Sequence, residues 1–572
     1  MSNLFGVQDL IRRSRQILAD KDLCQVAGMS EAYIQLFLLN LLQKACSDPE
    51  FPYRKLVVCL PKAAMVNQYL NLFDSFGEQF EPGRTSLLPY ISAWGHDRYV
   101  NPSLSRRQRL YSLAALQDPS HPAVVVTTLA GLMQSTLVRE DYQNAQLTLK
   151  VEQEYDQDEL LEALEDLGYR RVPSVEEEGV YAIRGGIIDV FPPNRNHPVR
   201  VEFVGDEIES IRDFLLANQR SIAAQSEVTL GPAAEVHLPR ASRKQDVQRF
   251  YEAMIDLDIN QADRDGMISA LRLGVRFSGF EMFSPILRQQ SAAGLSYAAA
   301  NESLLVFPKS LAACQENYED FWESAFTSYK RDLESERPSL TPQKHFPSWD
   351  QVAAELNLYK TLEFGNPYVA DQDAFLNLEG RSTLEGAPLP QTDKSELFDK
   401  WVERLSVLQK KEHSPICVLA SRKDSREKLT NLFQHRGLNC QNVDRAMQTY
   451  DAGQMTEPVI YLGLGDLSSH VWVEEKGTLF IPEHVLFGRP PKKSRPASAK
   501  LQNYLSSFKD LNVGDLVVHV QHGIARYKGM QTFPVGEVDG EFLILEYAGG
   551  DKIYLPVDRL NILQRYSSGD GG

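Results

Sequence analysis

Near the end of this 572-residue chain runs the stretch Leu511-Asn-Val-Gly-Asp-Leu-Val-Val-His-Val-Gln-His-Gly-Ile-Ala-Arg-Tyr-Lys-Gly-Met530. Short apolar and β-branched blocks, here and further on, are bounded by Gly and Asp where a chain must reverse. The pattern predicts a small β-barrel over residues 510–566. A domain of about 55 residues encloses only a thin core, so strand edges stay available to a partner. The pattern alone fits equally well a cap that stabilises a larger protein.

The residue order within this segment favours the docking role. Gly514-Asp515-x-Val517-Val518-His519-x-x-His522-Gly523-Ile524-x-Arg526-Tyr527-x-Gly529, followed by Lys552-x-Tyr554-x-Pro556-Val557, resembles the module shared by the CarD family and the bacterial transcription-repair coupling factors. The resemblance implies a Tudor-like or SH3-like barrel whose exposed strand pairs with the β subunit of RNA polymerase. The implied contact residues are Val518, His519, Val520, Gln521 and His522, with Val520 as the apolar anchor. Without further Cys or His nearby, the two histidines are expected to be turn residues and not zinc ligands.

Bulk composition favours protein partners over a generic grip on phosphates. Lys and Arg number 60 against 77 Asp and Glu, which gives a net charge of −17. The sequence shows neither a signal peptide nor an apolar run long enough to cross a bilayer, so no membrane association is expected. Six scattered cysteines without a CxxC pair indicate a reducing cytoplasm.

Residues 1–143 read as an α/β domain. Val26-Ala-Gly28-Met-Ser30 joins an expected strand to a helix, the position at which a P-loop would hold phosphates. No Lys-Thr or Lys-Ser follows Gly28, so Gly28 and Ser30 are expected to form a degenerate nucleotide loop that binds no cofactor.

Residues 144–225 change to short strands that predict an antiparallel sheet. Five arginines, Arg170, Arg171, Arg184, Arg200 and Arg212, are interleaved with carboxylates such as Glu202. Mixed charge on a sheet is usually a solvated face, and that interpretation stands beside a binding one.

A second resemblance bears on this region. Gly168-Tyr-Arg-Arg-Val172, Gly179-Val-Tyr-Ala-Ile-Arg-Gly-Gly-Ile-Ile-Asp-Val-Phe-Pro192 and Arg200-Val-Glu-Phe-x-Gly-Asp-Glu-Ile-Glu-Ser-Ile-Arg212 are similar to the second domain of the excinuclease subunit UvrB and of the coupling factors. The resemblance implies that this domain docks UvrA, through Arg170, Arg184, Phe191, Arg200 and Glu202. Arginine suits such a role because its fork binds carboxylates in a bidentate manner. The same resemblance implies that residues 1–143 and 226–393 form the two parts of a UvrB-like domain without its ATP site. No counterpart of the UvrB damage-clamping hairpin is visible.

The remaining segments carry little chemistry. Residues 394–488 predict a small α/β domain, in which Gly463-Leu-Gly465 is half a dinucleotide fingerprint and is assigned no ligand. Residues 489–509 predict a Pro-rich basic linker followed by a helix.

Three functions compete at this point. The first is an adaptor for transcription-coupled repair that binds a stalled RNA polymerase and recruits UvrA. The second is a self-contained nucleotide-binding enzyme, which the absence of any GxxxxGK[ST] motif disfavours. The third is a CarD-type transcription regulator, which leaves the UvrB-like half without a purpose. The family's motor, which would use ATP and Mg²⁺ and hold DNA, is expected to follow the barrel, so this chain is expected to be the N-terminal part of a coupling factor.

Overall fold

A computed structural model describes residues 7–488 with internal gaps, the longest at 77–83, 92–102, 366–374 and 378–393, and beyond residue 513 mainly the strands between 516 and 565. The chain divides into two units, formed mainly by residues 1–491 and 492–572, which are described separately. The predicted linker and helix at 489–509 lie outside the described residues, as do Val520, Gln521 and His522.

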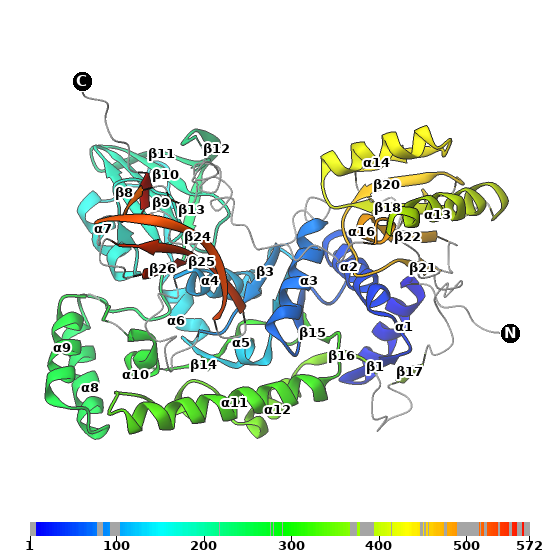
Figure 1. The fold of residues 1–572 in the computed structure, drawn as a ribbon. Helices are drawn as coiled ribbons and strands as arrows, with labels where there is room; N and C mark the ends of the chain where they lie inside the picture. The colour runs from blue at the N-terminus through cyan, green and yellow to red at the C-terminus, as the bar shows by residue number, and fades with distance from the viewer. Residues whose placement is uncertain are drawn as a thin grey trace. The chain divides into compact units, whose positions relative to one another are not determined.

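The larger unit is built on a parallel seven-stranded sheet with the order β17-β1-β16-β15-β2-β4-β3 (Figure 1). Its strands are β1 (Leu23–Ala27), β2 (Lys55–Cys59), β3 (Arg84–Leu88), β4 (Ala123–Thr127), β15 (Ser303–Phe307), β16 (Lys360–Phe364) and β17 (Phe375–Asn377). Strands from before residue 128 and from after residue 302 thus share one sheet, so the segment between them is an insertion. This arrangement confirms the predicted mixed α/β architecture.

Helices connect and cover these strands. They are α1 (Val7–Asp20), α2 (Glu31–Ser47), α3 (Ala63–Ser75), α4 (Ser103–Gln117), α5 (Leu129–Met133), α6 (Arg139–Asn144), α8 (Arg243–Asp256), α9 (Gln261–Arg272), α10 (Ser284–Leu287), α11 (Leu311–Glu334) and α12 (Trp349–Leu356). The central strands β2 and β4 are buried along their whole length, as expected of a parallel sheet covered on both faces. Lys55 is the charged residue of these two strands, and its Nζ donates to the carbonyls of Ala115, Asp118 and His121 at 2.8, 2.5 and 2.6 Å. These bonds satisfy carbonyl groups at the end of α4, where a cation is favourable.

The inserted segment forms a six-stranded sheet with the order β12-β11-β10-β9-β8-β7. The strands are β7 (Arg170–Arg171), β8 (Val180–Arg184), β9 (Ile187–Phe191), β10 (Val199–Val204), β11 (Glu207–Phe214) and β12 (Ser221–Gln225). The prediction of an antiparallel sheet is correct from β8 to β12 but wrong at one edge, where β7 pairs parallel to β8. The segment between β7 and β8 crosses back before pairing, so the two strands run in the same direction. A separate pair, β6 (Leu147–Lys150) with β13 (Glu227–Leu230), joins the two ends of the insertion.

Helix α7 (Gln157–Asp166) packs against one face of this sheet and ends in a cap formed by Leu167 and Gly168. Gly168 has a φ of 87°, and its N–H donates to the Glu165 carbonyl at 2.9 Å. The N–H of Tyr169 donates to the Leu164 carbonyl at 2.9 Å, which completes a Schellman cap. Glycine is required here because a residue with a Cβ rarely adopts this backbone conformation.

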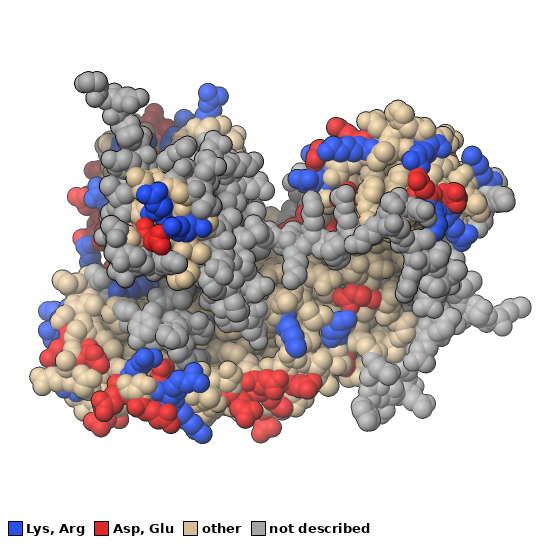
Figure 2. All heavy atoms as spheres, viewed as in Figure 1, with Lys and Arg blue, Asp and Glu red and all other residues tan. Residues whose placement is uncertain are grey.

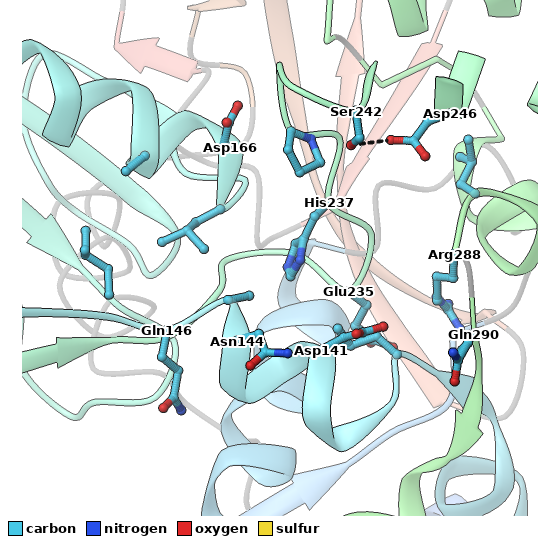
Figure 3. A pocket seen from close by; sticks show the side chains of 17 residues that line it. Asp141, Asn144, Gln146, Asp166, Glu235, His237, Ser242, Asp246, Arg288 and Gln290 are labelled. Atoms are coloured by element: carbon cyan, nitrogen blue, oxygen red, sulfur yellow. Dashed lines mark hydrogen bonds between the residues drawn. The ribbon is translucent and has the colours of Figure 1, made fainter. Parts of the chain in front are cut away.

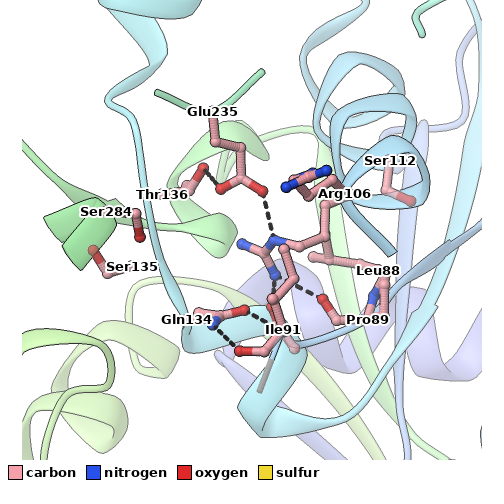
Figure 4. A network of polar contacts seen from close by, with 12 residues as sticks. Leu88, Pro89, Ile91, Arg106, Ser112, Gln134, Ser135, Thr136, Glu235 and Ser284 are labelled. Atoms are coloured by element: carbon pink, nitrogen blue, oxygen red, sulfur yellow. Dashed lines mark hydrogen bonds and ion pairs between the residues drawn. The ribbon is translucent and has the colours of Figure 1, made fainter. Parts of the chain in front are cut away.

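A buried polar network ties the exit of the insertion to the parallel-sheet domain (Figure 4). Arg109 of α4, fully buried, donates from Nε to Glu235 at 2.9 Å and from Nη1 to the carbonyls of Pro89 and Gly131. The Thr136 hydroxyl donates to the other Glu235 oxygen at 2.6 Å. Burial alone would raise the pKa of Glu235, but the guanidinium groups of Arg109 and Arg288 outweigh it and lower the pKa. Glu235 therefore stays ionised in the interior.

Residues 394–488 contain a five-stranded sheet of their own, flanked by helices. The sheet has the order β19-β20-β18-β22-β21, with strands β18 (Ile416–Ala420), β19 (Cys440–Asn442), β20 (Ile460–Leu464), β21 (Val471–Val473) and β22 (Thr478–Pro482), and with helices α13 (Lys394–Val407), α14 (Lys423–His435) and α16 (Glu483–Leu486). A Cβ at Gly465 would lie 2.2 Å from the Phe76 ring, and one at Gly463 would lie 2.6 Å from the Ala446 Cβ. Close packing accounts for both glycines, so neither indicates a nucleotide site.

The smaller unit contains a five-stranded antiparallel sheet with the order β26-β25-β24-β23-β27. The strands are β23 (Leu516–His519), β24 (Gly523–Val535), β25 (Val538–Glu546), β26 (Lys552–Pro556) and β27 (Leu563–Arg565). The predicted closed barrel is not confirmed, because within the described strands β26 pairs only with β25 and β27 only with β23. Because β27 is only three residues long, it offers few backbone groups to a second strand.

Candidate protein-docking sites

The six-stranded sheet has one face that is fully occupied by its own core. Apolar side chains alternate along the strands toward α7 and bury Leu160, Leu164, Tyr181, Ile188, Val190, Val199, Val201, Ile208 and Ile211. This alternation leaves the intervening residues on the opposite face, here called the second face. Every charged docking residue predicted within β8, β9 and β10 belongs to that second face.

Strand register arranges the second face in rows. Arg184 is opposite Ile187, Ile187 is opposite Glu202, and Glu202 is opposite Ser210. The adjacent row runs from Ala182 through Asp189, Arg200 and Arg212 to Ala224. Arg184 and Arg200 therefore lie on the same side of the sheet in neighbouring rows.

Arg200 is held by an internal carboxylate. Its Nε and Nη2 donate to the two oxygens of Asp189 at 2.7 and 2.9 Å, and its guanidinium lies 4.9 Å from the centre of the Phe214 ring. The side chains of Arg200 and Asp189 are 18% and 4% exposed, and the hydrogen bonds to Asp189 raise the pKa of Arg200. Arg200 is thus committed to the fold and offers only its remaining surface to a partner.

Among the predicted docking residues, Arg184 and Arg170 carry the accessible guanidinium groups. Arg184 is exposed at the end of β8, and within the described residues its side chain has no hydrogen bond or ion pair. Arg170, 68% exposed, pairs with Glu177 at 2.8 Å, and Glu177 also pairs with Arg107 at 3.1 Å. A partner carboxylate could bind Arg184 directly, whereas at Arg170 it would compete with Glu177.

The two other predicted residues have different surroundings. Phe191 is 3% exposed and packs with Val180, Ala182 and Phe214, so any docking role is limited to supporting the second face from within. Glu202 accepts from the Ser210 hydroxyl at 2.6 Å and lies 3.5 Å from Arg212. Its side chain remains partly accessible, at 24% exposure, in the row that contains Arg184.

Two exposed apolar groups of the six-stranded sheet were missed from the sequence. Val204 is 63% exposed and Ile222 is 47% exposed. Val204 follows Arg200 and Glu202 at the two-residue spacing of β10, so it shares their face, and this alternation was the signal that could have identified it. Exposed aliphatic groups beside unpaired charge are typical of a protein-binding surface.

The loop at Gly28 joins β1 to the start of α2, the position at which a phosphate loop would lie. Gly28 has a φ of 81°, and the Ser30 hydroxyl accepts from the N–H of Tyr33, which caps α2. The first helical residue is Glu31, an acid paired with Lys309. A carboxylate at the start of α2 repels the anion that a P-loop would bind there.

In the smaller unit, the predicted contact residues Val518 and His519 belong to β23, a strand that is hydrogen-bonded on both sides. Val518 pairs with Ile524 of β24 and with Gln564 of β27, and His519 pairs with Gly523 and Leu563. The expectation that this strand is an open edge is wrong for Val518 and His519, because β27 occupies the second side. The open edges among the described strands are β26 and β27.

Two absences are found among the described residues. Within the described residues, no group of three or more His, Cys, Asp and Glu side chains is placed to hold a metal ion, and no helix is long and apolar enough to cross a membrane. On the face drawn in Figure 2, basic and acidic side chains are interspersed over the described residues.

Comparison with known proteins gives two domain matches. The model of the UvrB interaction domain matches residues 147–236, and the model of the CarD-like/TRCF RID domain matches residues 511–567. The first match contains the second face, and the second contains β23 to β27.

Whole-chain relatives agree with these matches. The transcription-repair-coupling factor of Myxococcus xanthus is 30% identical over 501 residues, covering 85% of this chain and 41% of the relative. Those of Escherichia coli strain K12 and Bacillus subtilis strain 168 are 28% and 25% identical over 84% and 82% of this chain, and 40% and 39% of their own lengths. The chain thus spans about two fifths of these relatives. With its UvrB interaction domain and its CarD-like/TRCF RID domain, the chain belongs to the transcription-repair-coupling factor family and corresponds to the N-terminal part of those proteins.

Proposed function

We propose that this chain is an adaptor in transcription-coupled DNA repair, which binds the β subunit of RNA polymerase through residues 514–565 and UvrA through the second face of the six-stranded sheet. The supporting observation is that two domains of different families occupy segments with separate sheets. A protein that binds only one partner would need only one of these two domains. The proposal also follows the names of the relatives, which couple transcription to repair.

UvrA binding is assigned to the part of the second face around Arg184, Glu202 and Val204. Arg184 offers a guanidinium with no internal carboxylate to displace, and Val204 offers apolar surface on the same face. Interface arginines in such settings contribute on the order of 2 kcal/mol or more, because both partners lose water around a directed ion pair.

The test is Arg184→Glu, measured by calorimetric titration with UvrA. We expect affinity to fall at least about tenfold, because the substitution places a repelling charge at the contact. Arg171→Glu is the matched control: Arg171 is exposed on β7 opposite Tyr181, whose side chain belongs to the other face. Equal affinity of Arg184→Glu and wild type would remove the second face as the UvrA site.

Polymerase binding is assigned to the segment Val518 to His522. Because β23 is bonded on both sides, strand addition would have to use the edge of β26 or β27, and the segment itself would contribute side chains. We expect Val520→Arg to abolish retention of the chain on immobilised RNA polymerase while leaving UvrA affinity unchanged. Wild-type retention of that variant would contradict the assignment.

No nucleotide turnover is assigned to this chain. In the longer relatives, ATP, Mg²⁺ and most DNA contacts are proposed to belong to a motor outside the matched region. The acidic first turn of α2 supports this assignment. Micromolar retention of radiolabelled ATP in a filter assay would contradict it.

A further inference from the structure

The inserted domain contacts the surrounding helices around a cavity and again at α4. The cavity, of about 520 Å³, lies between α6, the end of α7 and the segment that leads into α8 (Figure 3). The carboxylates of Glu235, Asp246 and Asp166 in its wall each face an arginine of the fold. At α4, in contrast, a carboxylate of the inserted domain is shared with a predicted docking residue.

Helix α4 contacts the inserted domain through Arg107 and Tyr111, which lie one helical turn apart on the same face. Arg107 Nη1 donates to Glu177 at 3.1 Å, and its Nε lies 3.0 Å from a carboxylate oxygen of Glu178. The Tyr111 hydroxyl donates to the Asn196 side chain at 2.8 Å. These contacts fix the loop that carries the two glutamates against α4.

Glu177 is bound by two arginines, one at each carboxylate oxygen. Oε2 accepts from Arg107, and Oε1 accepts from Arg170 Nη2 at 2.8 Å. The side chains are 19% exposed at Arg107, 33% at Glu177 and 68% at Arg170. Arg107 thus anchors Glu177 from the less exposed side and presents it to the exposed docking arginine. An anchored carboxylate loses less side-chain freedom on binding Arg170 than a free one would.

The Glu177–Arg170 pair opposes a partner at Arg170. A carboxylate of UvrA that binds this guanidinium either replaces Glu177 at Nη2 or lies beside it, where two negative charges repel each other. Replacement costs less because Arg107 still binds the other oxygen of Glu177 after Arg170 has turned to the partner. Without Arg107, the exchange would leave a partly buried carboxylate without that cation.

We propose that Glu177 is a built-in competitor for Arg170, and that Arg107 keeps Glu177 paired when a partner displaces it. The inference rests on the proposed UvrA function and adds the chemistry of the partner group. Because the group replaces a glutamate on a guanidinium, UvrA presents an aspartate or glutamate side chain to Arg170.

The experiment is a calorimetric titration of the whole chain with UvrA. Glu177→Gln removes the competing charge at nearly constant size, so affinity should rise about two- to fivefold, the range expected for an exposed ion pair. Glu178→Gln is the matched control, because Glu178 also faces Arg107 but has no ion pair with Arg170 in the described structure. Its affinity should equal that of wild type.

Two more comparisons separate competition from a structural effect. In an Arg170→Ala background, Glu177→Gln should no longer change the affinity, because the group for which it competes is gone. Arg107→Ala should weaken binding about two- to fivefold, whereas Tyr111→Phe, which removes the other α4 contact and leaves Glu177 untouched, should not.

The inference is overturned if Glu177→Gln binds UvrA no better than Glu178→Gln, or if its gain persists without Arg170. Weaker binding by Glu177→Gln would also overturn it, because Glu177 would then position Arg170 for UvrA. These results leave the proposed function intact as long as the wild-type chain binds UvrA. A wild-type chain that does not bind UvrA would overturn both.

Discussion

Two arginines on the second face show how one residue type takes opposite roles. Arg200 is bound by Asp189 in a largely buried pair, whereas Arg184, in the adjacent row, has no partner in the described structure. Arg200 therefore stabilises the sheet, and Arg184 is available to another protein. Loss of UvrA binding would therefore indicate a lost contact in an Arg184 variant, but a destabilised sheet in an Arg200 variant.

Substitution of Arg200 should lower stability before it affects binding. Arg200→Ala leaves the 4%-exposed Asp189 carboxylate without its bidentate partner, so we expect the free energy of unfolding to fall by about 2–4 kcal/mol. Arg184→Ala should change it by less than about 0.5 kcal/mol, because the side chain is exposed. Urea denaturation measures both, and equal stability of the two variants would show that the Arg200–Asp189 pair contributes little.

His345 makes stability depend on pH. Burial, together with the nearby charge of Arg288, lowers the pKa of His345 to about 3, whereas an unfolded histidine titrates near 6.5. Between these values the unfolded state binds a proton that the folded state does not, so this contribution to stability is complete above about pH 6.5 and declines as pH falls toward 3. Wild type should lose up to about 1.4 kcal/mol more than His345→Gln per pH unit within that window. Parallel pH profiles for the two proteins in urea denaturation would contradict this.

At the scale of elements, the cap of α7 offers a direct test of a local rule. Gly168→Ala places a Cβ at a φ of 87° and 2.7 Å from the Ala234 Cβ, so strain and overpacking should together cost about 2–4 kcal/mol. Gly185→Ala has a φ of 60° but nothing within 4 Å of the new Cβ, so only the backbone strain of about 1 kcal/mol remains. Equal melting temperatures for the two variants would mean that contact with Ala234 is unimportant.

The elements also show what the sequence can predict. The strands Val180–Arg184, Glu207–Phe214 and Ile416–Ala420 can be located from the sequence, because alternation or an apolar run ends at clear Gly or polar breaks. The burial of Phe191 could not be predicted from alternation along its strand. It shares a face with Asp189 and Arg200, and is covered by Val175 and Phe214, which only tertiary folding brings there. The pairing of β27 with β23 depends likewise on a contact distant in sequence.

At the scale of the whole molecule, the two docking domains lie far apart in sequence and have sheets of their own. The proposed adaptor function requires that each partner be bound independently, and residues 237–510 separate the two domains in sequence. A net charge of −17 opposes non-specific adhesion to nucleic acid, so specific protein contacts must position the chain. The central claim is therefore that the chain bridges two partners. Each docking domain binds its partner alone, and UvrA is recruited to RNA polymerase only when both domains are in one chain.

The most direct test immobilises RNA polymerase, adds the chain with a protease site engineered into residues 489–496, and measures retained UvrA before and after cleavage. We predict that the intact chain retains UvrA and that cleavage releases it together with the N-terminal fragment, while the C-terminal fragment stays on the polymerase. Retention of UvrA after cleavage, or its absence with the intact chain when each partner binds separately, would contradict the bridging account.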